Sequence, residues 1–172
     1  ERSRQSLFER YEIITQNASD IIMMMDEDWK ITEVNERAVA TYGYRREELI
    51  GMDSAALRKP SSLTEVELEM ASLDRTGHHI FETLHRCSSG EILNVEVSAT
   101  KLKIGGKMYY LEIVRDITGR KKSEEELRES RQLFMDIISF LPDPTFVIDK
   151  AGTVLAWNRA LEMMSGVPAE EI

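Results

Sequence analysis

The spacing of apolar residues changes along the chain, and each spacing predicts a different element. Residues 1–18 place apolar side chains at a helical spacing, which predicts an N-terminal helix. Ile21–Met25 is a short apolar run typical of a strand, and Lys30–Val34 is expected to pair with it as a hairpin. Trp29 lies in the turn between them, where we expect it to be exposed.

Helix signals follow this hairpin. Asn35 precedes a short segment that stops at Gly43, so it is expected to cap a helix. Ser62 and Glu65 have the spacing of a capping box, which predicts the start of another helix. Gly77 is expected to end that helix.

Three consecutive strands are predicted next. Ile80–Cys87 is the first, and the second begins at Glu91 with strict alternation of apolar and polar residues. Gly105 and Gly106 form a hairpin turn before the third, Met108–Ile117. Two strands, short helices and three more strands predict an α+β fold, an antiparallel sheet with helices on one face.

The chain also repeats itself. Asp26–Asn35 and Asp149–Asn158 share a pattern of turn and strand that ends in asparagine, at an offset of 149 − 26 = 123 residues. We expect one full unit and the opening of a second, cut from a longer protein. Trp29 stands where the second copy has Gly152, so a different turn type is expected in the first copy.

A charged segment separates the two copies. Residues 119–141 contain no proline and carry a run of Lys, Arg and Glu, which predicts an exposed helix. Apolar residues recur in it at a sparse heptad spacing, which is compatible with a two-stranded coiled coil and a homodimer. The predicted dimer seam consists of Leu127, Phe134, Ile137, Ile138 and Leu141.

Composition narrows the range of partners. Lys and Arg total 22 against 31 Asp and Glu, a net charge of −9, so nucleic acid and anionic membranes are not expected partners. No apolar run is long enough to cross a bilayer, and we expect a cytoplasmic protein without membrane contact in this segment. Cys87 is the only cysteine, which excludes an internal disulfide and a cysteine-cluster metal site.

Taken in order, these motifs resemble the PAS domain of the S-box type. Residues 11–122 resemble a whole domain, with the DIT triplet near its end, and residues 134–172 resemble the first third of another. The resemblance implies a five-stranded sheet curled around a small cavity, with the PAS domain at residues 19–118 and a truncated copy at 142–172. It implies a sensory or relay module ahead of an output domain, such as a histidine kinase, in a multi-PAS signalling protein.

The resemblance also implies site residues. Asp116 and Thr118 resemble the family's junction, where side chains bond across the strand end and fix how the linker leaves; the alternative is that either residue caps a helix. Adaptable thioethers and apolar side chains would line the cavity for a small-molecule ligand, or would simply fill the core. The candidate cavity residues are Met23, Met25, Tyr42, Met52, Leu68, Met70, Phe81 and Leu111.

Neither haem nor covalent flavin is favoured as a cofactor. His78 and His79 are adjacent at a strand start and face opposite ways, so they are interpreted as surface residues, and His85 in mid-strand is given no role. Cys87 lies outside Met52–Arg58, the segment in which the family's flavin-linking cysteine would stand, and is interpreted as unreactive.

No catalytic motif is visible, since the sequence has no phosphoacceptor histidine motif, phosphate loop or hydrolase spacing. The chain is therefore not expected to be an enzyme. Three interpretations remain open: a ligand-binding sensor, a ligand-free dimerisation and relay module, and a small α+β enzyme or carrier. Because a lone two-stranded hairpin is marginal in water, residues 142–172 are expected to be ordered by the first unit, another chain or strand exchange.

Overall fold

The computed structural model describes residues 13, 15, 17–59 and 63–171 of the chain. Most of the helix predicted for residues 1–18, and the capping residue Ser62, lie outside these described residues. The chain divides into two compact units, Glu1–Gly119 and Arg120–Ile172. Each unit is described by itself below.

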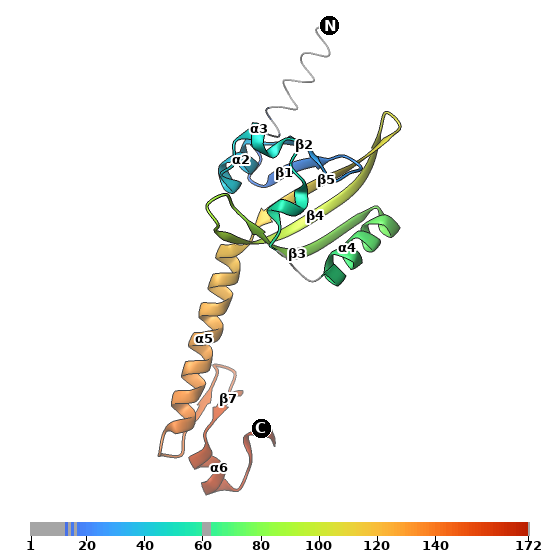
Figure 1. Cartoon of the computed structure of the whole chain (residues 1–172). Helices are drawn as coiled ribbons and strands as arrows, with labels where there is room; N and C mark the ends of the chain where they lie inside the picture. The colour runs from blue at the N-terminus through green and yellow to red at the C-terminus, as the bar shows by residue number, and fades with distance from the viewer. Residues whose placement is uncertain (1–12, 14, 16, 60–62, 172) are drawn as a thin grey trace. The chain divides into compact units, whose positions relative to one another are not determined.

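The first unit is a five-stranded antiparallel sheet with helices on one face, as predicted (Figure 1). The strands lie in the order β2-β1-β5-β4-β3, so the strand before the linker sits at the centre of the sheet. The elements in chain order are β1 (Ile21–Met25), β2 (Ile31–Val34), α2 (Glu36–Tyr42), α3 (Arg46–Leu49), η1 (Ser54–Leu57), α4 (Leu63–Thr76), β3 (His78–Arg86), β4 (Ile92–Ile104) and β5 (Lys107–Asp116).

Alternation along the strands decides what the sheet buries. In β4, Val95, Val97 and Ala99 are buried on the side of the helices, and the residues between them lie on the other face. Met23 and Met25 are buried in the same way from β1. The core therefore lies between the inner face of the sheet and the helices that cover it.

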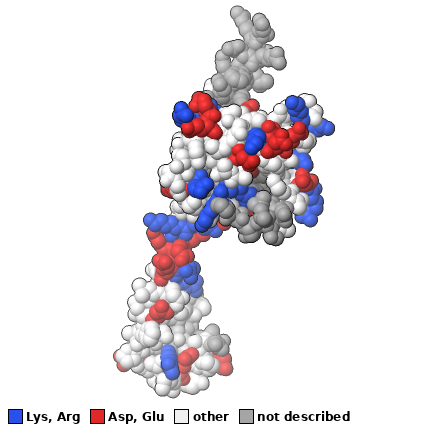
Figure 2. Space-filling model, viewed as in Figure 1, with Lys and Arg blue, Asp and Glu red and all other residues white. Residues whose placement is uncertain are grey.

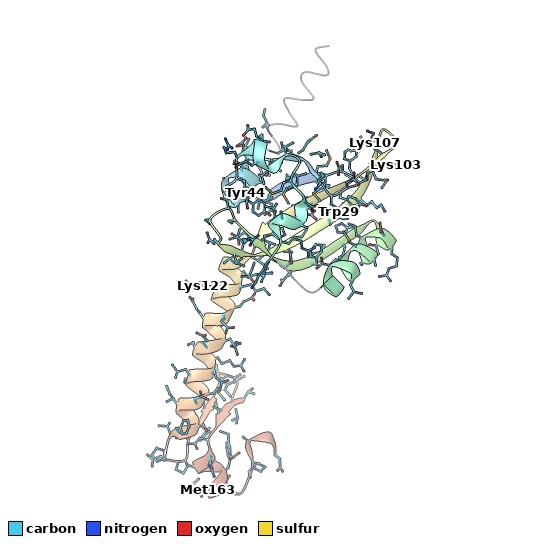
Figure 3. The ribbon with its side chains drawn as sticks, in the orientation of Figure 1. Trp29, Tyr44, Lys103, Lys107, Lys122 and Met163 are labelled. Atoms are coloured by element: carbon cyan, nitrogen blue, oxygen red, sulfur yellow. The ribbon has the colours of Figure 1, made fainter. Side chains whose placement is uncertain are left out.

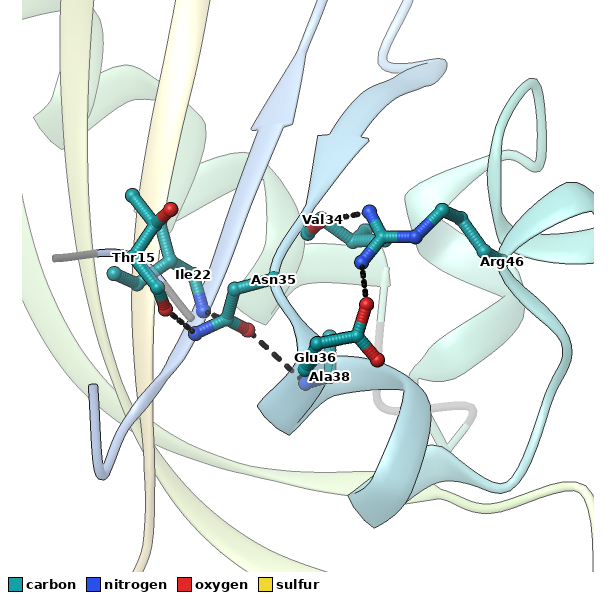
Figure 4. A network of polar contacts seen from close by, with 7 residues as sticks. All are labelled: Thr15, Ile22, Val34, Asn35, Glu36, Ala38 and Arg46. Atoms are coloured by element: carbon teal, nitrogen blue, oxygen red, sulfur yellow. Dashed lines mark hydrogen bonds and ion pairs between the residues drawn. The ribbon is translucent and has the colours of Figure 1, made fainter. Parts of the chain in front are cut away.

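Asn35 ties α2 to the first strand (Figure 4). Its Oδ1 accepts hydrogen bonds from the backbone N–H of Ala38 at 3.0 Å and of Ile22 at 3.1 Å. Its Nδ2 donates to the carbonyl oxygens of Thr15 and Asp20, each at 3.0 Å. The side chain is 4% exposed and fully bonded, so the predicted helix cap is confirmed and also fixes a long-range contact.

The second unit contains a long helix, a hairpin and a short helix. Its elements are α5 (Thr118–Phe140), which begins at the boundary of the first unit, β6 (Phe146–Ile148), β7 (Val154–Trp157), α6 (Arg159–Ser165) and η2 (Ala169–Glu171). Asn158 repeats the role of Asn35, since its Oδ1 accepts from Thr145 N at 2.9 Å and from Leu161 N at 3.0 Å. Among the described residues no helix is long and apolar enough to cross a membrane.

The turn at Trp29 corrects a prediction. Trp29 has φ +60°, in the left-handed region that Gly152 occupies at φ +86° in the second copy. In both turns the first aspartate accepts two backbone hydrogen bonds. Asp26 accepts from the N–H groups of Asp28 and Lys30. Asp149 accepts in the same way from Ala151 and Thr153. The expected change of turn type is therefore wrong: the bonded aspartate keeps the turn, and the tryptophan adopts the strained conformation.

Candidate functional site

A cavity of about 450 Å³ lies inside the first unit, between the inner face of the sheet and the helical side. Apolar side chains form most of its wall. They come from four elements, and they include Met23 of β1, Phe81 of β3, Val97 and Ala99 of β4, and Met70 and Leu73 of α4. A space of this size accommodates a small organic molecule.

An ion pair lies in the wall of the cavity. Arg58 follows η1, and its Nη2 lies 2.6 Å from Oε2 of Glu69 on α4, with both side chains about one-fifth exposed. The Arg58 guanidinium also lies 5.4 Å from the centre of the Phe81 ring. Backbone pairing of Arg58 with His85 on β3 sets its position. Its buried Nε has no hydrogen-bond partner in the described part of the chain, so the arginine keeps one donor free beside the cavity.

Glu112 brings a carboxyl group into the cavity from the middle of β5. It shares the inner face of that strand with Tyr110 and Val114, which are buried. Burial raises the pKa of Glu112 from 4.5 to about 7, with Arg58 opposing the rise and Glu69 adding to it. Near neutral pH this carboxyl therefore exists in both protonation states.

His85 lines the same cavity and is 3% exposed. Its Nδ1 lies 2.7 Å from the hydroxyl oxygen of Tyr42. Burial, followed by the charge of Arg58, lowers the pKa of His85 to about 4, so the ring is neutral at physiological pH. Burial also raises the pKa of Tyr42, which keeps its hydroxyl protonated. If the hydroxyl donates to Nδ1, the proton of the imidazole is on Nε2.

Trp29 forms an aromatic wall. Its ring stacks on Tyr110 with 4.1 Å between the centroids and 14° between the planes. Figure 3 shows Trp29 on the helical side of the sheet, and its carbonyl accepts a hydrogen bond from Ser54 N of η1 at 3.0 Å. The expectation that Trp29 is exposed is wrong, because the stack on Tyr110 turns the ring inward to line the cavity.

The predicted cavity residues divide into three groups. Met23, Met70 and Phe81 line the cavity. Met25 and Tyr42 are fully buried in the adjoining core, and Met52 packs partly buried against that core, so these three fill space beside the cavity.

Two candidates are wrong. Leu68 is 66% exposed, because it lies on the outward side of α4 while Glu69 and Met70 reach the cavity. Leu111 lies on the outer face of the sheet, since neighbours in a strand face opposite ways and Glu112 faces inward.

The polar groups of the cavity were missed at the sequence level. Glu112 had a detectable signal: in Met108–Ile117 it occupies the same alternating face as Tyr110 and Val114, an unusual place for a charge. His85 also falls on a buried strand position. Arg58 and Glu69 gave no such signal, because their pairing depends on how α4 packs against the sheet.

Each junction residue forms one of the two kinds of contact expected for it. Asp116 Oδ1 accepts from the backbone N–H of Thr118 at 2.8 Å, which caps the start of α5. Thr118 Oγ1 accepts from the backbone N–H of Asn94 on β4 at 2.9 Å. The two interpretations of this triplet therefore hold together: Asp116 caps the helix, and Thr118 bonds across the strand end.

Apolar residues of the predicted seam stand exposed on α5. Leu127 is 72%, Ile137 53% and Phe134 48% exposed, while Ile138 is half-buried. Leu141 lies one residue beyond the helix, which ends at Phe140 ahead of Pro142. Figure 2 shows charged side chains concentrated on the first half of α5, with mostly uncharged surface on the rest of the second unit.

The remaining two histidines and the cysteine contact other side chains or the backbone of the first unit. His78 is exposed, with Nδ1 3.0 Å from Thr100 Oγ1, and the His79 ring lies 5.5 Å from the Phe81 ring. Cys87 is buried, and its Sγ donates to the carbonyl of Thr41 at 3.3 Å. Burial raises the pKa of Cys87, which disfavours the reactive thiolate.

Comparison with known proteins gives consistent matches. Two family models described as a PAS fold match residues 15–122 and residues 132–172. A methyl sulfide methyltransferase-associated sensor from Methanosarcina acetivorans is 31% identical over 116 residues, which cover 67% of this chain and 12% of that protein. Sporulation kinase E from Bacillus subtilis is 26% identical over 157 residues, which cover 87% of this chain and 20% of that protein. The chain thus spans at most a fifth of either relative.

Solved structures agree with these sequence matches. The PAS domain of an HTR-like protein from Haloarcula marismortui has a TM-score of 0.61 and 27% identity, covering 67% of this chain and 96% of that chain. A PAS domain from a two-component sensor histidine kinase has a TM-score of 0.58 at 22% identity, covering 66% of this chain and 98% of that chain. The second similarity supports the fold alone.

Proposed function

Since this chain belongs to the PAS family, we propose that it is the sensory module of a signal-transduction protein, in which a small molecule binds the cavity and α5 carries the response. A sensory role in signalling accords with relatives named as sensors and sensor kinases. The output of the longer protein is proposed to be a histidine kinase, located outside this chain.

One observation carries the proposal: β5 lines the cavity and leads directly into the linker helix α5. Glu112 lines the cavity from β5, and Asp116, at the end of β5, caps α5. Thr118 bonds this exit to β4 through Asn94. A ligand that shifts β5 relative to β4 would change the hydrogen bonds that set the start of α5, and we propose that binding acts on α5 through this junction.

Native mass spectrometry and an absorbance spectrum of the purified chain test the sensory proposal. We expect a stoichiometric small-molecule adduct, or binding of an added compound, that slows hydrogen exchange at the Asn94 amide. Occupancy of the cavity with no change at Asn94 would remove the relay from the proposal. Neither haem nor a cysteine-linked flavin is part of it.

A second candidate is a ligand-free relay that acts through dimerisation. The exposed apolar residues of α5 favour it, because Leu127 and Phe134 are seven residues apart on one helix. Molecular mass in solution tests the dimer, and an occupied cavity separates this candidate from the sensor.

Both candidates act by binding and not by catalysis. We place both in the cytoplasm without a nucleic-acid or membrane partner, in keeping with the net charge of −9.

A further inference from the structure

Glu112 brings a carboxyl group into the cavity, and no described side chain forms an ion pair with it. In the described part of the chain no side chain donates a hydrogen bond to it. Arg58 acts on it electrostatically, but the guanidinium is bound to Glu69 at 2.6 Å. His85 is neutral, so it brings no positive charge, and its Nδ1 is bound to the hydroxyl of Tyr42. An ionised Glu112 thus lacks the partner that a buried charge requires.

The other charged groups that line the cavity do not supply that partner. Asp28 and Asp53 are acids, and Asp53 Oδ2 lies 3.2 Å from the ammonium group of Lys30. Lys59 also lines the cavity, but among the described residues it forms no ion pair with Glu112. With Arg58 and Glu69 cancelling one another, the cavity has an excess of negative charge.

The aromatic wall suits a cation as well. One face of Trp29 is stacked on Tyr110, and the ring lines the cavity with no second stacking partner among the described residues. The Phe81 ring already faces the Arg58 guanidinium. Trp29 attracts a cation over its free face more strongly than the other aromatic side chains do, and Met23 adds an apolar surface nearby.

We propose that the cavity binds a small protonated organic amine, with its ammonium group paired to Glu112 and its apolar part against Trp29 and Met23. The inference rests on the proposed sensory function and names the chemistry of the ligand at the same site. A carboxylate ligand fits less well, because it would approach Glu112 and Glu69, and Arg58, whose Nη2 is paired with Glu69, offers it only the Nε hydrogen.

Calorimetric titration with three matched probes tests the ligand class: 2-phenylethylamine, 2-phenylethanol and phenylacetate. The amine is expected to bind at least about tenfold more tightly than the other two at pH 8, the ratio typical of a gained buried charge pair. Because Glu112 is largely protonated at pH 6, amine binding there should release a substantial fraction of one proton, measured in two buffers of different ionisation enthalpy. His85 stays neutral over this range and adds nothing to the proton count.

Glu112→Gln should lower the affinity for the amine at least about tenfold and abolish the proton release. Glu96→Gln is the matched control, since Glu96 lies in mid-strand on the opposite face of the sheet, and it should change neither. The wild-type pH series keeps the test valid if the Glu112 variant does not fold.

The outcomes separate the two proposals. Binding of phenylacetate or 2-phenylethanol as tight as that of the amine, or unchanged amine binding by Glu112→Gln, overturns the amine inference and leaves a sensor of another ligand class. If none of the three probes binds and the purified protein carries no small molecule, the ligand-sensing function falls with it.

Discussion

Replacing Glu112 with glutamine keeps the size of the side chain and removes its charge, so it isolates what an ionised carboxyl costs inside the cavity. The folded-state pKa of Glu112 is about 7, raised from 4.5 chiefly by burial. Below pH 4.5 the carboxyl is protonated in the folded and the unfolded chain, and the cost is absent. As pH rises through 7 the unfolded chain loses the proton first, so stability falls until both states are ionised.

The size of this effect follows from the pKa shift. Each pKa unit corresponds to about 1.4 kcal/mol, so ionised Glu112 lowers the free energy of unfolding by about 3 kcal/mol above pH 7. His85 acts in the opposite direction. Its pKa is lowered from 6.5 to about 4, so its contribution is intact above pH 6.5 and is lost, again by about 3 kcal/mol, as pH falls to 4.

The stability of the wild type should therefore change little between pH 4.5 and 6.5, because the loss of stability from Glu112 and the gain from His85 largely cancel as pH rises. Glu112→Gln removes the loss of stability that ionisation of Glu112 causes. The variant's gain in the free energy of unfolding relative to wild type should therefore grow by about 3 kcal/mol between pH 4.5 and 8. Urea unfolding followed by circular dichroism at several pH values measures this difference, with Glu96→Gln as the control. A stability difference that is independent of pH would refute a half-buried, unpaired Glu112.

Three further changes have defined outcomes. Trp29→Gly should be about 1 kcal/mol more stable to urea than Trp29→Ala, because both lose the stack on Tyr110 and only glycine accepts φ +60° without strain. Thr118→Val should cost about 1–2 kcal/mol and speed hydrogen exchange at Asn94, whose amide loses its acceptor. Replacing Leu127 and Phe134 together with glutamate should halve the mass in solution measured by light scattering, since two charges would enter the proposed seam.

Each of these predictions has a control and a contradicting result. Greater stability of Trp29→Ala would mean that the backbone at the turn is not strained. Thr153→Val changes an exposed threonine of the second unit and should leave exchange at Asn94 unaltered. Lys122→Glu with Gln132→Glu places negative charge on α5 away from the seam, and a mass that fell equally for this pair would argue against a specific dimer.

The sheet and its order of elements could be predicted because their signals are local. Three of these signals act within a few residues and are present in the structure. They are the alternation of buried and less buried residues in β4, the helix cap at Asn35 and the left-handed conformation of Gly43. The turn at Trp29 was missed because the hydrogen bonds to Asp26 and the long-range stack on Tyr110 hold a backbone conformation that tryptophan itself disfavours.

The chemistry of the cavity depended on tertiary packing. The pairing of Arg58 with Glu69 joins a loop to a helix, and no sequence spacing encodes it. Apolar candidates were chosen by type, so Leu68 was included although the helix turns it outward, and Glu112 was overlooked although its strand position faces inward. Applying the alternation of inward- and outward-facing positions along a strand to charged as well as apolar residues would have identified Glu112 as a cavity residue.

The relay from cavity to linker is the central claim, and filling the cavity tests it most directly. Ala99 is buried and lines the cavity, so Ala99→Leu should occupy the space that a ligand needs. Hydrogen exchange at Asn94 is the readout, measured in wild type and Ala99→Leu with and without saturating 2-phenylethylamine or the compound that copurifies. The account predicts ligand-dependent protection of this amide in wild type and none in Ala99→Leu. Equal exchange in all four samples, with the wild-type cavity shown to be occupied, would contradict it.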